Sequence, residues 1–152
     1  MSKVNRGKQF EKVFEENWKK SFPNTFIYRL KDDVSGYFGT SRNPCDFLCL
    51  PKDKLFMIEV KAHYGNTFPF SAFSQYETLK SYAGCQNVLQ GVMIWFIDHS
   101  RIIYVPIETI TKMMKDGLKS VNINKLDGYV YVDIPSKKKR VFLESDYSIL
   151  IV

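Results

Sequence analysis

The sequence has few of the residues that build disulfide frameworks or zinc sites. Its three cysteines, Cys45, Cys49 and Cys85, are odd in number and form no CxxC pair. The two histidines, His63 and His99, are not spaced to complete a four-ligand zinc site. We therefore expect free, buried thiols in a reducing compartment.

Long apolar runs, repeats and flexible linkers are also absent. No apolar run approaches the length needed to cross a bilayer. Residues 1–20 mix charged and aromatic side chains, without the apolar core or cleavage site of a signal peptide. No repeat, low-complexity tract or Gly/Ser linker divides the chain. We expect one domain over residues 1–152, in the cytoplasm and not in a membrane.

The composition is that of a folded, basic protein. Hydrophobic residues make up 45% of the chain and aromatic residues 15%, which favours a packed core over disorder. The formal net charge of +6 favours anionic partners, of which nucleic acid is the commonest. Many basic proteins bind no DNA, so the charge alone does not decide the function.

The hydrophobic pattern predicts an α/β protein. In chain order we expect a helix over 6–20, a strand over 25–30, a hairpin over 45–50 and 55–62, a capped helix from Ser74 to about Ala83, strands over 88–97 and 101–105, a helix after Pro106 and a strand over 129–134. Residues 64–71 are predicted to be an irregular connection. This order implies a mixed central β-sheet flanked by helices, and it leaves the role of residues 117–152 open.

The predicted hairpin carries an unusual set of charges. Side chains alternate faces along a strand, so Glu59 and Lys61 lie side by side on an otherwise apolar strand. If Leu50 faces Leu55 across the turn, Asp46 lies opposite Glu59. Two carboxylates placed so would repel each other, and burial would add a desolvation penalty. A hard cation such as Mg²⁺ between them would relieve both effects.

This interpretation depends on the strand register, because a slip of one residue would separate the charges. The alternative is an ordinary surface ion pair between Glu59 and Lys61 at the end of an edge strand. Asp46 would then lie in a turn before its own strand. The residues alone leave both interpretations open.

The motif Asn43-Pro44-Cys45-Asp46, followed thirteen residues after Asp46 by Glu59-Val60-Lys61, resembles the PD-(D/E)XK nuclease core. The proline is displaced by one position from the usual pattern. The resemblance implies a restriction-endonuclease-like fold. It also implies that Asp46, Glu59 and the Val60 carbonyl hold Mg²⁺, with Mn²⁺ as a substitute, while Lys61 assists the attacking water.

Two further matches point to Holliday-junction-resolving members of this superfamily, the archaeal and RecU-like types. Gly7-Lys8-Gln9-Phe10-Glu11 resembles the Gly-x-x-x-Glu of their first helix, which implies that Glu11 adds to the metal site. Glu15, one turn further on, is the substitute, and a solvated helix glutamate is the alternative. Ser74-Gln75 resembles a His-Gln pair, which implies that Gln75 positions a phosphate or a metal-bound water.

The resemblance implies a homodimeric DNA endonuclease that resolves four-way junctions by symmetric cuts. Tyr37 and Phe38 would stack on exposed bases or anchor their loop. The loop after residue 31 is short for a resolvase, so a restriction- or repair-type endonuclease on duplex or flap DNA stays open. So do a non-catalytic DNA-binding protein on the same fold and a small soluble protein with no nucleic-acid role, in which the motif is chance. The expected backbone contacts are Lys8, Arg29, Lys31, Arg42, Lys137, Lys138, Lys139 and Arg140, the last four being alternatively a solvated turn.

Overall fold

A six-stranded mixed β-sheet forms the centre of the computed structural model, which describes residues 5–31 and 43–151. The strand order is β1-β2-β3-β5-β6-β8, and the β3–β5 pair is parallel while the other neighbours are antiparallel. The predicted mixed α/β fold is therefore confirmed. The strands are β1 (Phe26–Arg29), β2 (Phe47–Leu50), β3 (Leu55–His63), β5 (Val88–Phe96), β6 (Arg101–Pro106) and β8 (Val132–Ile134).

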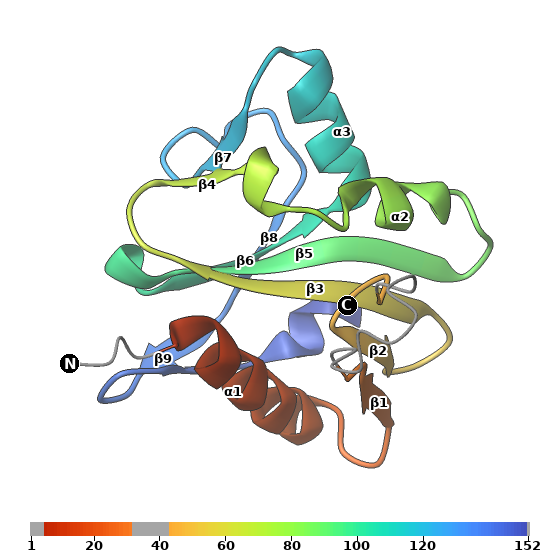
Figure 1. Cartoon of the computed structure of the whole chain (residues 1–152). Helices are drawn as coiled ribbons and strands as arrows, with labels where there is room; N and C mark the ends of the chain where they lie inside the picture. The colour runs from red at the N-terminus through yellow and green to blue at the C-terminus, as the bar shows by residue number, and fades with distance from the viewer. Residues whose placement is uncertain (1–4, 32–42, 152) are drawn as a thin grey trace, which may run out of the picture.

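Helix α1 (Arg6–Ser21) covers one face of this sheet (Figure 1). The helix begins where the Asn5 side chain accepts a hydrogen bond from the Lys8 backbone N–H at 3.1 Å. Its buried stripe packs on alternate residues of β2 and β3, in a core that also takes in Tyr147 of the 3-10 helix η3 (Tyr147–Ile151). The hairpin of β9 (Ser136–Lys138) and β10 (Leu143–Ser145) lies on this same side.

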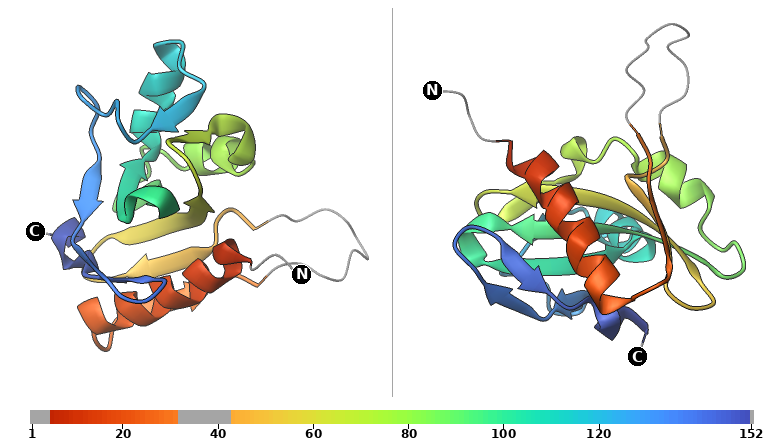
Figure 2. Two further views of the ribbon diagram at one scale, coloured as in Figure 1. Left: turned by 90° about the vertical axis from the view of Figure 1, so that its left-hand side faces the viewer. Right: turned by 90° about the horizontal axis from the view of Figure 1, so that it is seen from below.

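The opposite face is covered by α2 (Tyr76–Ser81) and α3 (Ile107–Lys115), as Figures 1 and 2 show. A small antiparallel sheet of β4 (Thr67–Pro69) and β7 (Ser120–Asn122) extends this layer, with the 3-10 helix η1 (Phe70–Ala72) beside it. The parallel β3–β5 pair is thus enclosed between two layers. That position explains why β5 reads as a continuous apolar run, since residues 90–96 are all buried.

The register of the β2–β3 hairpin agrees with the prediction. The pairs are Phe47↔Ile58, Leu48↔Met57 and Cys49↔Phe56, so the same offset sets Leu50 opposite Leu55 and Asp46 opposite Glu59. The predicted faces are also correct. Met57 packs into the α2/α3 core, whereas Phe56 and Ile58 pack into the α1 core.

Four local predictions were wrong. The three thiols were expected to be buried, but only Cys45 and Cys49 are buried, and Cys85 is exposed. The helix expected at Ser74 begins at Tyr76, and its N-cap residue Gln75 makes no side-chain capping bond, because the Ser74 hydroxyl donates to Gln75 Oε1 instead. The connection over residues 64–71 contains β4 and η1 and is not irregular. The strand expected over residues 129–134 is confined to β8, since the Val130 carbonyl accepts from the Thr109 hydroxyl.

Within residues 5–31 and 43–151, no helix is both long enough and apolar enough to cross a membrane.

Candidate active site

Asp46 is held at the start of the β2–β3 hairpin by backbone bonds on both sides. Its N–H donates to the Ile58 carbonyl at 3.1 Å, and its carbonyl accepts from the Leu30 N–H at 2.8 Å. The carboxylate Oδ2 accepts from the Val60 N–H at 2.8 Å. The carboxylate is therefore fixed against β3, next to the residues that the sequence pattern pairs with it.

Glu59 is a buried acid without enough hydrogen-bond partners. Only 1% of its surface is exposed, and its Oε2 atom has no hydrogen-bond partner among the described residues. Burial raises the pKa of Glu59 to about 10, and the hydrogen bond and negative charge of Asp46 act in the same direction. The Lys61 charge lowers this pKa and the Glu11 charge raises it, each by less. At neutral pH the carboxyl group needs a proton or another cation.

Lys61 lies two residues beyond Glu59 on the same face of β3 and is half-buried. Cys45, directly before Asp46, is buried, and desolvation together with the Glu59 and Asp46 charges raises the pKa of its thiol. The thiol therefore stays neutral. The charges of this hairpin segment come from the two carboxyl groups and the lysine.

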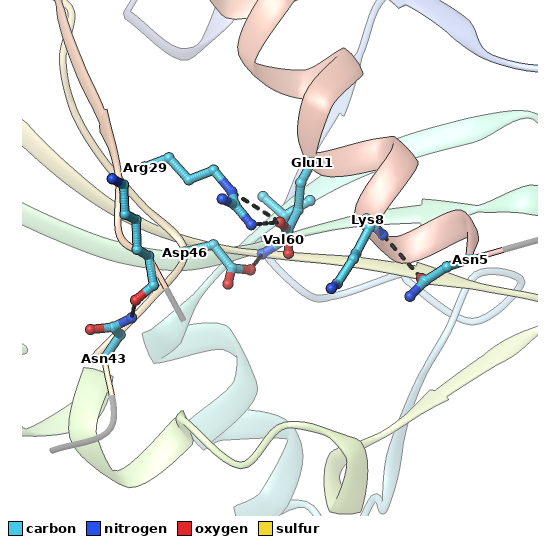
Figure 3. Close-up of polar contacts among 8 residues, drawn as sticks. Asn5, Lys8, Glu11, Arg29, Asn43, Asp46 and Val60 are labelled. Atoms are coloured by element: carbon cyan, nitrogen blue, oxygen red, sulfur yellow. Dashed lines mark hydrogen bonds and ion pairs between the residues drawn. The ribbon is translucent and has the colours of Figure 1, made fainter. Parts of the chain in front are cut away.

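Glu11 approaches the site from α1 but is ion-paired with Arg29 of β1. Arg29 Nη2 and Nε lie 2.9 and 3.2 Å from one carboxylate oxygen, Glu11 Oε2. Figure 3 shows this pair beside Asp46 and Val60. Across residues 5–31 and 43–151, no three His, Cys, Asp or Glu side chains gather closely enough to hold a metal ion. The predicted ligands are neighbours, but Glu11 is directed to Arg29.

The residues present nevertheless fit a divalent cation. A buried carboxyl oxygen with no partner, next to a second carboxylate on the facing strand, is a costly arrangement in a protein interior. Oxygen ligands are those that Mg²⁺ prefers. Asp46 and Glu59 would hold such an ion, with Glu11 and the Val60 carbonyl as further donors.

Two other predicted site residues, Gln75 and Glu15, form their hydrogen bonds or ion pairs with other partners. Gln75 is half-buried at the start of α2, and no hydrogen bond within the described part of the chain joins it to Asp46 or Glu59. Glu15, the substitute for Glu11, forms an ion pair with Lys19 on α1, with Lys19 Nζ 2.8 Å from Glu15 Oε2.

The predicted DNA contacts near α1 and the edge strand β1 are exposed. Lys8, Arg29 and Lys31 are all exposed, and the Asn43 side chain donates to the Lys31 carbonyl. The basic run on the β9–β10 hairpin is exposed throughout and consists of Lys137, Lys138, Lys139 and Arg140. Lys139 Nζ lies 3.3 Å from Glu144 Oε2. Arg42, Tyr37 and Phe38 lie outside the described residues.

Sequence reasoning missed two features of this region. It assigned Glu11 to the metal and Arg29 to DNA, but it did not foresee that the two pair with each other. They are 18 residues apart on different elements, so no periodicity could link them. It also missed Arg6, whose guanidinium lies 5.9 Å from the Phe142 ring centre and so connects α1 to the β9–β10 hairpin.

Comparison with known proteins finds similarity among solved structures. No protein-family model matches the chain, and no curated protein matches it. A solved structure of Hjc, a Holliday junction resolvase from the archaeal hyperthermophile Archaeoglobus fulgidus, matches with a TM-score of 0.50 at 22% sequence identity. The match covers 68% of this chain and 78% of that one. At this identity the likeness shows the fold: the chain has the mixed α/β, restriction-endonuclease-like core of that resolvase.

Proposed function

We propose that the protein is a Mg²⁺-dependent endonuclease that hydrolyses DNA phosphodiester bonds. The observation that carries this proposal is the carboxyl pair of Asp46 and Glu59 on facing strands. Glu59 is 1% exposed and its Oε2 has no partner in the described part of the chain, so the pair is stable at neutral pH only with a proton or a cation. A buried acid of this kind beside a lysine is typical of a catalytic centre.

Each residue of the site has a distinct task in this proposal. Asp46, Glu59, Glu11 and the Val60 carbonyl hold the metal, which supplies Lewis-acid stabilisation of the phosphate when bound. The Val60 N–H keeps the Asp46 carboxylate oriented through its 2.8 Å bond. Lys61 orients the attacking water and stabilises negative charge that develops on the phosphate oxygens.

The substrate we propose is branched DNA, with a four-way junction as the first candidate. Exposed cations on β1, α1 and the β9–β10 hairpin supply phosphate contacts. The fold likeness to an archaeal junction resolvase supports the choice of a branched substrate. Paired cuts on a symmetric junction require two active centres, so the active species in this proposal is a homodimer.

The deciding experiment measures cleavage of labelled four-way junction, duplex and flap DNA, with Mg²⁺, Mn²⁺ or EDTA. Wild type is compared with Glu59→Ala and with Asp53→Asn, a control that removes an exposed carboxylate from the turn of the same hairpin. We expect paired nicks on the junction with Mg²⁺ or Mn²⁺, no cleavage in EDTA, no cleavage by Glu59→Ala and normal cleavage by Asp53→Asn.

Three other outcomes are informative. Cleavage of all three substrates would leave a general endonuclease and remove the preference for branched DNA. Salt-sensitive DNA binding without cleavage on any substrate would indicate a non-catalytic binding protein on this fold. Cleavage that survives both EDTA and Glu59→Ala would overturn the proposed metal site.

A further inference from the structure

We propose that the Arg29 guanidinium stands in for a metal cation at the active site and holds the Glu11 carboxylate. A divalent metal then replaces Arg29 as the partner of Glu11, and the released guanidinium binds a DNA phosphate. This inference rests on the proposed nuclease function. It assigns to Arg29 a positioning role that couples metal binding to DNA binding. It also gives a reason for the ion pair between Glu11 and Arg29 beside the Asp46–Glu59 pair.

The β1–β2 ladder positions Arg29 near Asp46 and within reach of Glu11. Arg29 pairs with Phe47 across the β1–β2 ladder, and the next residue, Leu30, bonds the Asp46 carbonyl at 2.8 Å. Paired residues share a face and Phe47 packs into the α1 core, so the Arg29 side chain lies on the α1 face, where its guanidinium reaches Glu11. Figure 3 shows Arg29, Glu11 and Asp46 converging on this region.

A cation is needed here even without a metal. The Glu11 carboxylate lies beside Asp46 and Val60 in Figure 3, and Glu59 directly precedes Val60 on β3, so three carboxyl groups lie in this part of the molecule. Arg29 supplies a compensating charge, through two N–H groups that donate to a single oxygen of Glu11.

The pair is also weak enough to exchange. The Arg29 and Glu11 side chains keep 40% and 19% of their surface exposed, and an exposed ion pair is worth little in water. A doubly charged ion that also contacts Asp46 and Glu59 competes effectively with one guanidinium. The displaced guanidinium has the planar fork that binds phosphate oxygens bidentately. Metal and DNA would then strengthen each other's binding, and by equal factors.

The first test titrates Mn²⁺ into the full chain and follows heat. Wild type is compared with Arg29→Met and with Arg101→Met, which breaks a similar exposed pair with Asp133 on β6 and β8. We expect Arg29→Met to bind Mn²⁺ about twofold to tenfold more tightly, because the competing cation is gone. Arg101→Met should match wild type.

The second test measures duplex DNA binding in EDTA. Arg29→Met should weaken DNA binding severalfold, so the same change acts on metal and on DNA in opposite directions. Glu11→Gln should tighten DNA binding in the wild-type background, because it releases Arg29. In the Arg29→Met background, Glu11→Gln should have little effect on DNA affinity. If Glu11→Gln acted only by removing a negative charge, it would raise DNA affinity equally in both backgrounds.

The inference is overturned if Arg29→Met leaves Mn²⁺ affinity unchanged or weakens it while the variant unfolds at the wild-type temperature. It is equally overturned if Glu11→Gln tightens DNA binding regardless of residue 29. Failure of the proposed function has a different signature. In that case wild type itself takes up no Mn²⁺ and cuts no DNA, whatever residue stands at position 29.

Discussion

Two antiparallel hairpins in this molecule carry clustered charges, and they hold them in opposite ways. In the β2–β3 hairpin the acid Glu59 is 1% exposed and Asp46 is fixed by three hydrogen bonds. In the β9–β10 hairpin every residue of the basic run 137–140 is exposed. Burial destabilises the carboxyl pair of the β2–β3 hairpin unless a ligand is bound, whereas water solvates the basic run of the β9–β10 hairpin without any ligand. A buried charge therefore argues for a specific partner much more strongly than an exposed one.

The largest effect that separates the two hairpins is expected at Lys61. Lys61→Met should slow cleavage by a factor of about 10²–10⁴, because the proposed water-orienting and charge-stabilising group is lost. Single-turnover cleavage with saturating Mg²⁺ measures this rate. Lys54→Met, which changes an exposed lysine in the turn of the same hairpin, serves as the control. Equal rates for Lys61→Met and wild type would remove Lys61 from the chemistry.

Because Glu59 is buried, the stability of the metal-free protein should depend on pH. Its pKa rises on folding from an ordinary 4.5 to about 10, so the folded state binds the proton more tightly. The stability from this proton is complete below pH 4.5 and is lost as pH rises toward 10. Glu59→Gln removes this dependence. In EDTA the free energy of unfolding of the variant, relative to that of wild type, should therefore rise with pH by up to about 1.4 kcal/mol per pH unit.

Urea unfolding at several pH values in EDTA measures that difference. Glu77→Gln, an exposed change on α2, should follow wild type at every pH. Added Mg²⁺ should stabilise wild type and leave Glu59→Gln unaffected, since binding to the folded state alone raises stability. Parallel pH curves for wild type and Glu59→Gln would mean that Glu59 is solvated.

The β2–β3 hairpin was predictable because strand geometry is strict. The alternation of side chains and the four-residue turn fixed which residues share a face, so the opposition of Asp46 and Glu59 followed from counting. The burial of β5 followed equally from its unbroken apolar run. Whether these residues hold a metal and cut DNA stays a prediction.

Other features depend on contacts that leave no local pattern. The Arg29–Glu11 pair joins β1 to α1, and the β4–β7 sheet joins segments more than 50 residues apart. Ser74 has the spacing of a capping box with Glu77, yet its hydroxyl bonds the neighbouring Gln75 side chain, a competing local bond. Tertiary contacts decided the first two cases, and a bond between neighbouring side chains decided the third; none of them follows from the spacing of residues in the sequence.

The basic run should act through long-range attraction to DNA. Changing Lys137, Lys138 and Arg140 together to Gln should weaken DNA binding about tenfold at moderate salt, and reduce the slope of log affinity against log salt by up to about 2.7. Changing Lys115, Lys119 and Lys125 to Gln removes the same charge from the α3 side and serves as the control. Equal losses in both triple variants would mean that only net charge matters.

The smallest effect is expected for the ion pair within the basic hairpin. Lys139 and Glu144 keep 52% and 50% of their side-chain surface exposed, at an Nζ–Oε2 distance of 3.3 Å. Lys139→Gln should therefore change the free energy of unfolding by less than about 0.5 kcal/mol. The hairpin is anchored instead by the buried bond from Asn17 to the Leu143 carbonyl. Urea unfolding of Lys139→Gln tests this, and a loss above about 1 kcal/mol would show that its charge stabilises the fold as well as DNA binding.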